Sequence, residues 1–297
     1  MKKSRKKKSA ANISFVIFNT ILLTLFCVIT LYPILNTLAI SANEAADTLK
    51  GGITLLPRKF TLENYKTVFR TDSLVRGAYI SVLRTVIATV VQMLTTSLVS
   101  YVLTRKEFLF NKQVSKFYVL SMYVGGGMIP TLLLNKSLGL TNNFWVYVIP
   151  GLVYAYNMIV VRTYMNGLPD SLVESAQVDG AGHLKIFVRI ILPLCKPVLA
   201  TVALFIAVGQ WNSWFDVMLY NSGRPDLTTL QYELMKLLSS VSSQAGDPNT
   251  AKHSASMVTP ESVRAAATIV TAFPIVCLYP FLQRYFVTGL TIGGVKE

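Results

Sequence analysis

The sequence is poor in charged residues. Only 14% of its 297 residues are Asp, Glu, Lys or Arg, whereas a soluble domain carries about 25%. Hydrophobic residues make up 52% of the chain and the mean hydropathy is +0.49. This balance excludes a large water-soluble domain, because apolar stretches occupy most of the length. We therefore predict an all-α integral membrane protein.

Residues suited to metal binding or acid–base chemistry are also scarce. The three cysteines are far apart, form no CxxC pair, and are interpreted as small buried apolar residues. The two histidines, His183 and His253, have no ligand-type neighbour, and no paired carboxylates indicate hydrolysis. The Gly-rich segment 124–130 lacks the Lys of a phosphate-binding loop. We expect no catalytic residue, metal site or cofactor on this chain.

The net charge of +14 is concentrated in part at the N-terminus, where residues 2–8 hold six Lys and Arg. They precede the apolar run 13–40, and basic residues in front of such a run set its orientation in the membrane. A secretory signal peptide is the alternative, but the run is too long and lacks a small-residue cleavage site. We predict a retained first span and no nucleic-acid partner.

Six segments are apolar over about the 20 residues that a membrane span needs. They are 13–40, 78–104, 117–134, 144–165, 190–210 and 265–283. The third is interrupted by three consecutive glycines and Pro130. Such breaks are tolerated beside protein or a water-filled pathway, so we expect this span to face one of these.

The distribution of Lys and Arg predicts that both termini are cytoplasmic. The inner segments 1–12, 105–116, 162–197 and 284–297 carry more of these residues than the outer segments 41–77, 135–143 and 211–264. We predict a basic cytoplasmic tail at 1–12, an extracytoplasmic loop at 41–77, a core domain at 78–283 with an inner loop at 166–197 and an outer loop at 211–264, and a cytoplasmic tail at 284–297.

The two long outer segments contain helical patterns. Residues 61–69 have apolar side chains at helical spacing, with Thr61 placed to cap the helix. Residues 227–238 are amphipathic. The stretch 239–256 is rich in Ser, Asp and Gly, and we predict a mobile link there.

The inner loop carries the most informative pattern, ESAQVDGAGHLKIFVRIILPLCKP at 174–197. Asp170 and Ser171 offer caps for a short helix, and two glycines then allow a sharp turn. A second short helix is expected at 183–191. Such a rigid protrusion can enter a groove of a soluble partner, although an ordinary amphipathic loop fits the same pattern.

This loop resembles the EAA loop of ATP-binding-cassette importer permeases, whose pattern combines Glu-Ala-Ala, Asp-Gly-Ala and Ile-x-Leu-Pro. The matching positions are Glu174, Ala176, Asp179, Gly180, Ala181, Ile190, Leu192 and Pro193. Ser175 stands where the first Ala of the motif lies. The resemblance implies a type I importer permease of about six spans, whose cytoplasmic coupling helix docks on an ATPase subunit that binds the ATP and Mg.

Three further stretches are similar to permeases of polysaccharide and oligosaccharide importers. They are GGGMIPTLLL at 125–134, GQWNSWFDVMLY at 209–220 and YPFLQRYFVTGLTIGGVK at 279–296. The resemblance implies a bacterial inner-membrane assembly with a second homologous permease subunit, two ATPase subunits, an extracellular solute-binding protein and a sugar oligomer as cargo.

A sugar site needs flat apolar faces beside planar polar groups, and residues 210–216 contain both. The candidate solute-pathway residues are Tyr123, Asn157, Gln210, Trp211, Asn212, Trp214 and Asp216. Trp214 equally suits interfacial anchoring. Asp216 equally suits a structural cap, although an acid at membrane depth indicates function. Arg84 is expected to extend towards the outer interface.

Three other interpretations fit parts of the sequence. The EAA-like loop alone does not name a solute, so an importer of peptides or amino acids remains open. An ion-coupled secondary transporter needs ionisable groups within the membrane and usually an inverted repeat. Arg84 and Asp216 provide few such groups, and no repeat is visible in the sequence. A membrane-anchored scaffold subunit would need neither.

Overall fold

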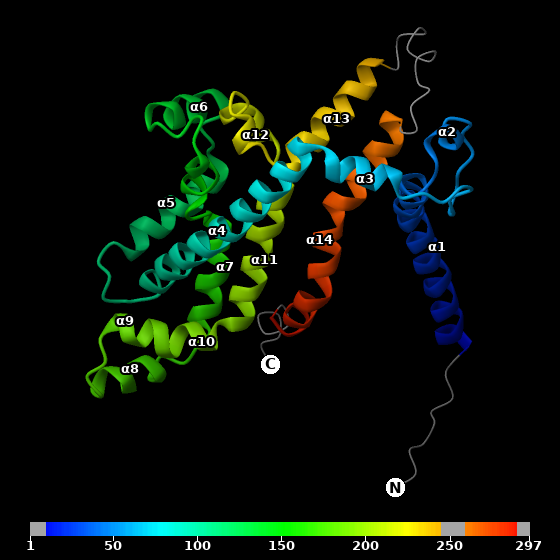
Figure 1. Cartoon of the computed structure of the whole chain (residues 1–297). Coiled ribbons are helices and arrows are strands. Elements are labelled where there is room, and N and C mark those ends of the chain that lie inside the picture. Colours follow the sequence, from blue (N-terminus) through cyan, green and yellow to red (C-terminus); the bar gives the residue numbers. More distant parts are fainter. Residues whose placement is uncertain (1–9, 245–258, 290–297) are drawn as a thin grey trace. The chain divides into compact units, whose positions relative to one another are not determined.

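The computed structural model describes residues 10–244 and 259–289, and the regular elements within them are all helical (Figure 1). This confirms the predicted all-α class. The chain divides into two compact units. The first comprises the described residues of Met1–Arg70 and Leu237–Val270, and the second those of Thr71–Lys236 and Thr271–Glu297.

The first unit contains α1 (Ala10–Ser41), α2 (Ala45–Thr48) and α3 (Glu63–Arg70). The side chains of 14–34 on α1 are exposed on every side, although the helix is strongly apolar. A helix that is apolar all round is suited to lipid rather than water. Helix α1 is therefore consistent with the predicted first membrane span.

Hydrogen bonds hold the loop after α1 in place. The buried Asn64 amide donates to the carbonyl oxygens of Ser41 and Asn43, at 2.9 Å each. Arg58 forms an ion pair with Asp47 at 2.9 Å. The predicted helix at 61–69 is confirmed as α3, and the Thr61 hydroxyl accepts from the backbone N–H of Glu63 at 3.2 Å.

The second unit is built on α4 (Asp72–Val102), α7 (Ala155–Asn166) and α11 (Lys196–Asn212), which pack against one another (Figure 1). The buried positions of α4 are largely polar and recur at helical spacing: Ser81, Arg84, Gln92, Thr96 and Ser100. Its apolar side chains face outwards, as at Val86, Val90 and Leu94. This arrangement is the reverse of a soluble helix and matches a lipid-exposed span that buries a polar stripe.

Several expected spans are broken or bent. The third divides into α5 (Asn111–Tyr123) and α6 (Met128–Ser137), and Gly127 between them has φ +84°. The fourth begins with the short helices η1 (Phe144–Tyr147) and η2 (Ile149–Gly151), which bend by 48° from α7. Among the described residues, α4 and the stretch Ser14–Ser41 of α1 are each long and apolar enough to span a membrane. The number rises to four if the bent pairs Phe144–Gly151 with α7 and His183–Leu194 with α11 (Lys196–Asn212) are each one span. The total of six stays a prediction.

The fifth span begins later than predicted. The helical run α9 (His183–Ile186), η3 (Phe187–Ile191) and α10 (Leu192–Leu194) continues through Pro193, and the chain then turns by 83° into α11. The break falls at Cys195, because Pro197 has no N–H to continue the hydrogen-bond ladder across it. Residues 190–194 therefore belong to the inner loop.

The remaining elements are α12 (Phe215–Tyr220), η4 (Pro225–Leu227), α13 (Leu230–Gln244) and α14 (Pro260–Gly289). The predicted link at 239–256 is wrong for 239–244, which continue α13 because these serines follow an amphipathic helix without a Gly or Pro to end it. Residues 245–258 lie outside the described part of the chain.

Candidate functional site

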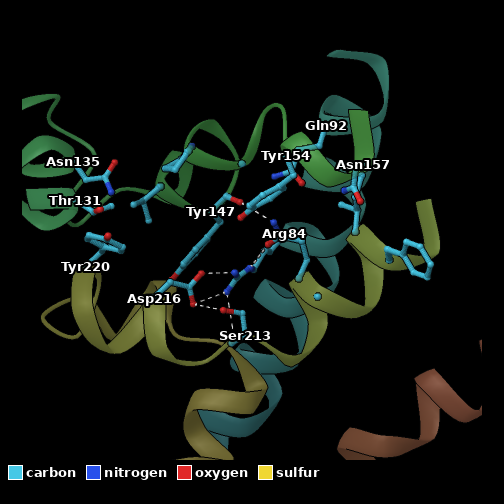
Figure 2. Close-up of a pocket in the computed structure, with 17 residues that line it drawn as sticks. Arg84, Gln92, Thr131, Asn135, Tyr147, Tyr154, Asn157, Ser213, Asp216 and Tyr220 are labelled. Atoms are coloured by element: carbon cyan, nitrogen blue, oxygen red, sulfur yellow. Dashed lines mark hydrogen bonds and ion pairs between the residues drawn. The ribbon is translucent and has the colours of Figure 1, made fainter. Parts of the chain in front are cut away.

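A cavity of about 420 Å³ lies within the second unit and is lined by side chains from α4, α6, the η1–η2 bend, α7, α11 and α12 (Figure 2). Its size falls in the range of small-ligand sites. Three of the seven predicted pathway residues line it: Asn157, Gln210 and Asp216. The cavity forms because η1–η2 and the break after α11 keep these segments from packing as straight helices.

A buried arginine organises one wall of the cavity. Arg84 is 2% exposed, forms an ion pair with Asp216 through both carboxylate oxygens, and donates from Nε to Gln210 Oε1 at 2.7 Å (Figure 2). Its guanidinium carbon lies 4.4 Å from the ring centre of Tyr147. The expectation that Arg84 extends to the outer interface is therefore wrong, because the chain break after α11 brings Asp216 to it.

Asp216 also stabilises the break itself. Its Oδ1 accepts from the Ser213 hydroxyl at 2.8 Å and from the backbone N–H of Val217 at 2.9 Å. Asp216 is not the cap of α12, because it lies in the first turn of that helix and no side-chain cap bond forms. Gln210 is likewise engaged on both sides, since its amide donates to the carbonyl of Tyr147 at 3.2 Å.

The other four predicted pathway residues do not line this cavity. Tyr123 is 82% exposed on α5 and Asn212 is exposed at the end of α11. The Trp211 indole is buried and donates to the carbonyl of Thr271 at 2.9 Å. Trp214 packs edge-to-face on Phe215, at 5.7 Å between ring centres. Solute contact by these four stays a prediction.

Sequence reasoning missed several cavity residues. Asn135 on α6, Gln92 on α4 and Tyr147 on η1 all line it. Arg84 and Gln92 were detectable as polar residues eight apart in an apolar span, hence on one helix face. Asn135 gave a weaker signal, because it lies at the end of an interrupted apolar segment.

The inner loop begins with α8 (Ser171–Val178), as predicted. Gly180 has φ +76°; its N–H donates to the carbonyl of Gln177, and the N–H of Ala181 donates to that of Ala176, both at 2.9 Å. This pair of bonds is a Schellman motif, which requires a left-handed residue and so favours glycine. The predicted sharp turn is confirmed.

One face of the loop is buried against the core helices of the second unit. Val173 and Ala176 of α8 and Ile186, Phe187 and Ile191 of the following run share one apolar cluster. The cluster also contains residues from α4, α7 and α11: Tyr101, Val161, Met165, Val198, Val202 and Ile206. The loop is therefore packed onto the core helices and is not a free connection.

The motif positions divide between the two faces of the loop. Glu174, Ser175, Asp179 and Gly180 are exposed, whereas Ala176 is buried and Ala181 and Leu192 are partly buried. Pro193 lies exposed in α10. The motif residues thus include both packing positions and exposed positions.

Asp170 does not cap α8, contrary to the prediction. Its carboxylate instead pairs with Lys106 at 3.0 Å, and no side-chain cap bond forms. The hydrogen bond between them and the charge of Lys106 lower the pKa of Asp170, and the same bond and the charge of Asp170 raise the pKa of Lys106. This exposed pair joins the α4–α5 connection to the start of the inner loop.

The geometry agrees with comparisons to known proteins. A solved structure, of a bacterial ABC transporter involved in the import of the acidic polysaccharide alginate, matches with TM-score 0.86 and 27% identity, covering 95% of this chain and 99% of that one. This match confirms the predicted importer-permease fold.

Sequence comparisons give the same result. The polygalacturonan/rhamnogalacturonan transport system permease protein YtcP of Bacillus subtilis (strain 168) is 33% identical over 274 residues, covering 92% of this chain and 95% of that protein. Protein LplC of the same strain is 36% identical over 270 residues, covering 90% of each. A family model described as "Binding-protein-dependent transport system inner membrane component" matches residues 5–292. The chain therefore belongs to the family of inner membrane components of binding-protein-dependent transport systems.

Proposed function

We propose that this chain is the permease subunit of an ATP-driven importer that carries an oligosaccharide or polysaccharide fragment across the bacterial cell membrane. The family membership supports the transport role. The names of the relatives, which refer to polygalacturonan and alginate, support a carbohydrate cargo. No comparable observation favours a peptide, an amino acid or an ion-coupled mechanism.

The observation that carries this proposal is the continuity between the inner loop and the cavity. Helix α7 supplies Asn157 to the cavity and Val161 to the apolar cluster, one helical turn apart. Helix α11 supplies Gln210 to the cavity, and its Ile206 belongs to both the cavity lining and the apolar cluster. Because close-packed interiors transmit displacement, a push on the loop moves the helices that form the cavity wall.

The exposed face of the loop is suited to a soluble partner. Val178 at the end of α8 is 88% exposed and Leu184 on α9 is 70% exposed, beside the exposed Glu174 and Asp179. Large apolar side chains rimmed by polar groups are typical of protein contacts. In the proposed assembly this face docks on an ATPase subunit, which binds the ATP and Mg and carries out hydrolysis.

The complete importer then contains two ATPase subunits, a second homologous permease subunit and an extracellular solute-binding protein. Closure of the ATPase pair draws the two inner loops together and switches the pathway between inward-open and outward-open states. The proposed topology places both termini and the inner loop in the cytoplasm, and the 41–77 segment outside.

The coupling step is tested with Val178→Arg in the co-expressed assembly. Gly180→Trp is less suitable, because a side chain at φ +76° strains the turn itself. We expect Val178→Arg to assemble with its partners but to lose sugar uptake. Leu109→Arg is the matched control, since Leu109 is 87% exposed outside the loop. Normal uptake by Val178→Arg would refute the role of the loop.

The cargo is tested by uptake of labelled oligogalacturonides and of arabino-, galacto- and malto-oligosaccharides into cells that express the full assembly. We expect uptake of at least one of them, and its loss when the ATPase is deleted. Uptake of none would refute a carbohydrate cargo. Uptake that survives deletion of the ATPase would favour an ion-coupled transporter.

A further inference from the structure

We propose that the cavity recognises the uncharged hydroxyl groups of a sugar through the amides of Asn135 and Asn157, and that Arg84 does not bind a sugar carboxylate. This inference rests on the proposed function, because it assumes a carbohydrate cargo.

The charged groups of the cavity are already paired with each other. Arg84 directs its Nε at Gln210, its Nη1 at Asp216 and the carbonyl of Ser213, and its Nη2 at Asp216. Asp216 accepts further from Ser213 and Val217. Among the described residues that line the cavity, Arg84 is the only basic one. A carboxylate entering here would have to displace Asp216 from its ion pair with the buried Arg84, which is unfavourable.

The two asparagines are in the opposite situation. Asn135 is 4% exposed and Asn157 is 8% exposed, and both line the cavity. Neither side-chain amide forms a hydrogen bond with any described part of the chain, and neither belongs to the buried atoms that are sealed from solvent. A polar group buried this far normally has a partner. These amides therefore face the cavity with their donors and acceptors unused.

Amides match sugar chemistry. Each primary amide presents a donor and an acceptor side by side, and a pair of neighbouring hydroxyls presents the complementary groups. In Figure 2, Asn135 lies beside Thr131 on one side of the cavity and Asn157 beside Gln92 on the other, with Tyr147 and Tyr154 between them. The Tyr154 ring, which is 56% exposed, offers an apolar face for the C–H surface of a sugar ring.

Gln92 also lines the cavity, but its carbonyl oxygen is not open to a solute. Its Nε2 donates to the carbonyl of Val148 at 3.3 Å, while its Oε1 is buried and has no partner. A Cβ on Gly151 would lie 2.5 Å from that Nε2, so η2 passes close to the end of this side chain. Because that Oε1 is sealed from solvent, it offers the solute no acceptor, and recognition by amides rests on Asn135 and Asn157.

The test uses Asn135→Ala and Asn157→Ala in the full assembly, with Lys136→Gln on α6 and Thr163→Ala on α7 as controls, because both control side chains are exposed and absent from the cavity lining. The probes are the oligosaccharides that the wild-type assembly takes up. Any acidic probe is paired with its carboxyl-reduced form, which keeps the hydroxyls and removes the charge.

We expect each Asn→Ala variant to raise the KM for uptake about tenfold, as the loss of one or two hydrogen bonds predicts. The increase should be equal for the acidic and carboxyl-reduced probes, and the controls should match wild type. An unchanged KM in both variants would overturn the proposal while wild-type uptake leaves the proposed function intact. An increase confined to the acidic probe would also overturn it, since it would show carboxylate recognition. Absence of wild-type uptake would instead refute the carbohydrate function itself.

Discussion

The cavity wall and the inner loop are held together in different ways. The cavity wall depends on a few polar contacts between residues far apart in sequence, such as Arg84 with Gln210 and Asp216. The loop depends on a contiguous apolar cluster and on a turn formed by neighbouring residues. The first should respond to loss of a single charge, whereas the second should tolerate small local changes. The comparison teaches that one chain can combine a region held by long-range polar contacts with a region held by apolar packing and a local turn.

The largest effect is expected from Arg84→Met. This change leaves Asp216 without its counter-charge in a largely buried setting, which costs about 3 kcal/mol or more. Thermal melting of the purified assembly should show clear destabilisation, together with loss of uptake. The double variant Arg84→Met/Asp216→Leu removes both charges and should recover much of the stability. A double variant no better than the single one would show that the pair does not hold the wall together.

A smaller effect is expected from Gly180→Ala. An L-residue at φ +76° costs about 1 kcal/mol relative to glycine, although a Cβ there would meet no atom within 4 Å. Gly182→Ala is the matched control, because Gly182 has φ −70° and an equally open surrounding. Melting and sugar-stimulated ATPase activity should change only in the first variant. Equal effects in both would indicate that contact with the partner, and not backbone conformation, requires these glycines.

The smallest effect is expected from the Lys106–Asp170 pair. The pKa of Asp170 is lowered in the folded protein, so the pair contributes stability above the ordinary Asp pKa of 3.8. That contribution is lost as the pH falls through the lowered pKa. Both side chains are exposed and screened by salt, so Asp170→Asn should change melting slightly at pH 7 and low salt and not at all at high salt. A large, salt-independent change would show that Asp170 acts through a partner contact.

Local features were predictable from the sequence. The helix after Asp170, the turn at Gly180 and the surface helix at α3 depend on neighbouring residues, and their positions agreed with the structure. The start of the fifth span was misplaced because both Pro193 and Pro197 are possible breaks, and the helical run continues through Pro193 before the chain turns.

Long-range pairing was not predictable in the same way. Arg84 is 132 residues from Asp216 along the chain. Nothing in either local sequence indicates the other, so the same arginine was equally compatible with reaching towards the interface. The unused amides of Asn135 and Asn157 were likewise hidden, because only the fold shows which buried polar groups find partners.

The sequence alone determined that this is a helical membrane protein with an importer-type inner loop, since apolar length, charge distribution and a contiguous motif are all local properties. Only the tertiary structure decided which polar residues neutralise each other and which remain open in the cavity. The physical reason is that a hydrogen bond or ion pair requires two groups within about 3 Å, and their separation in space is set by how the broken helices pack.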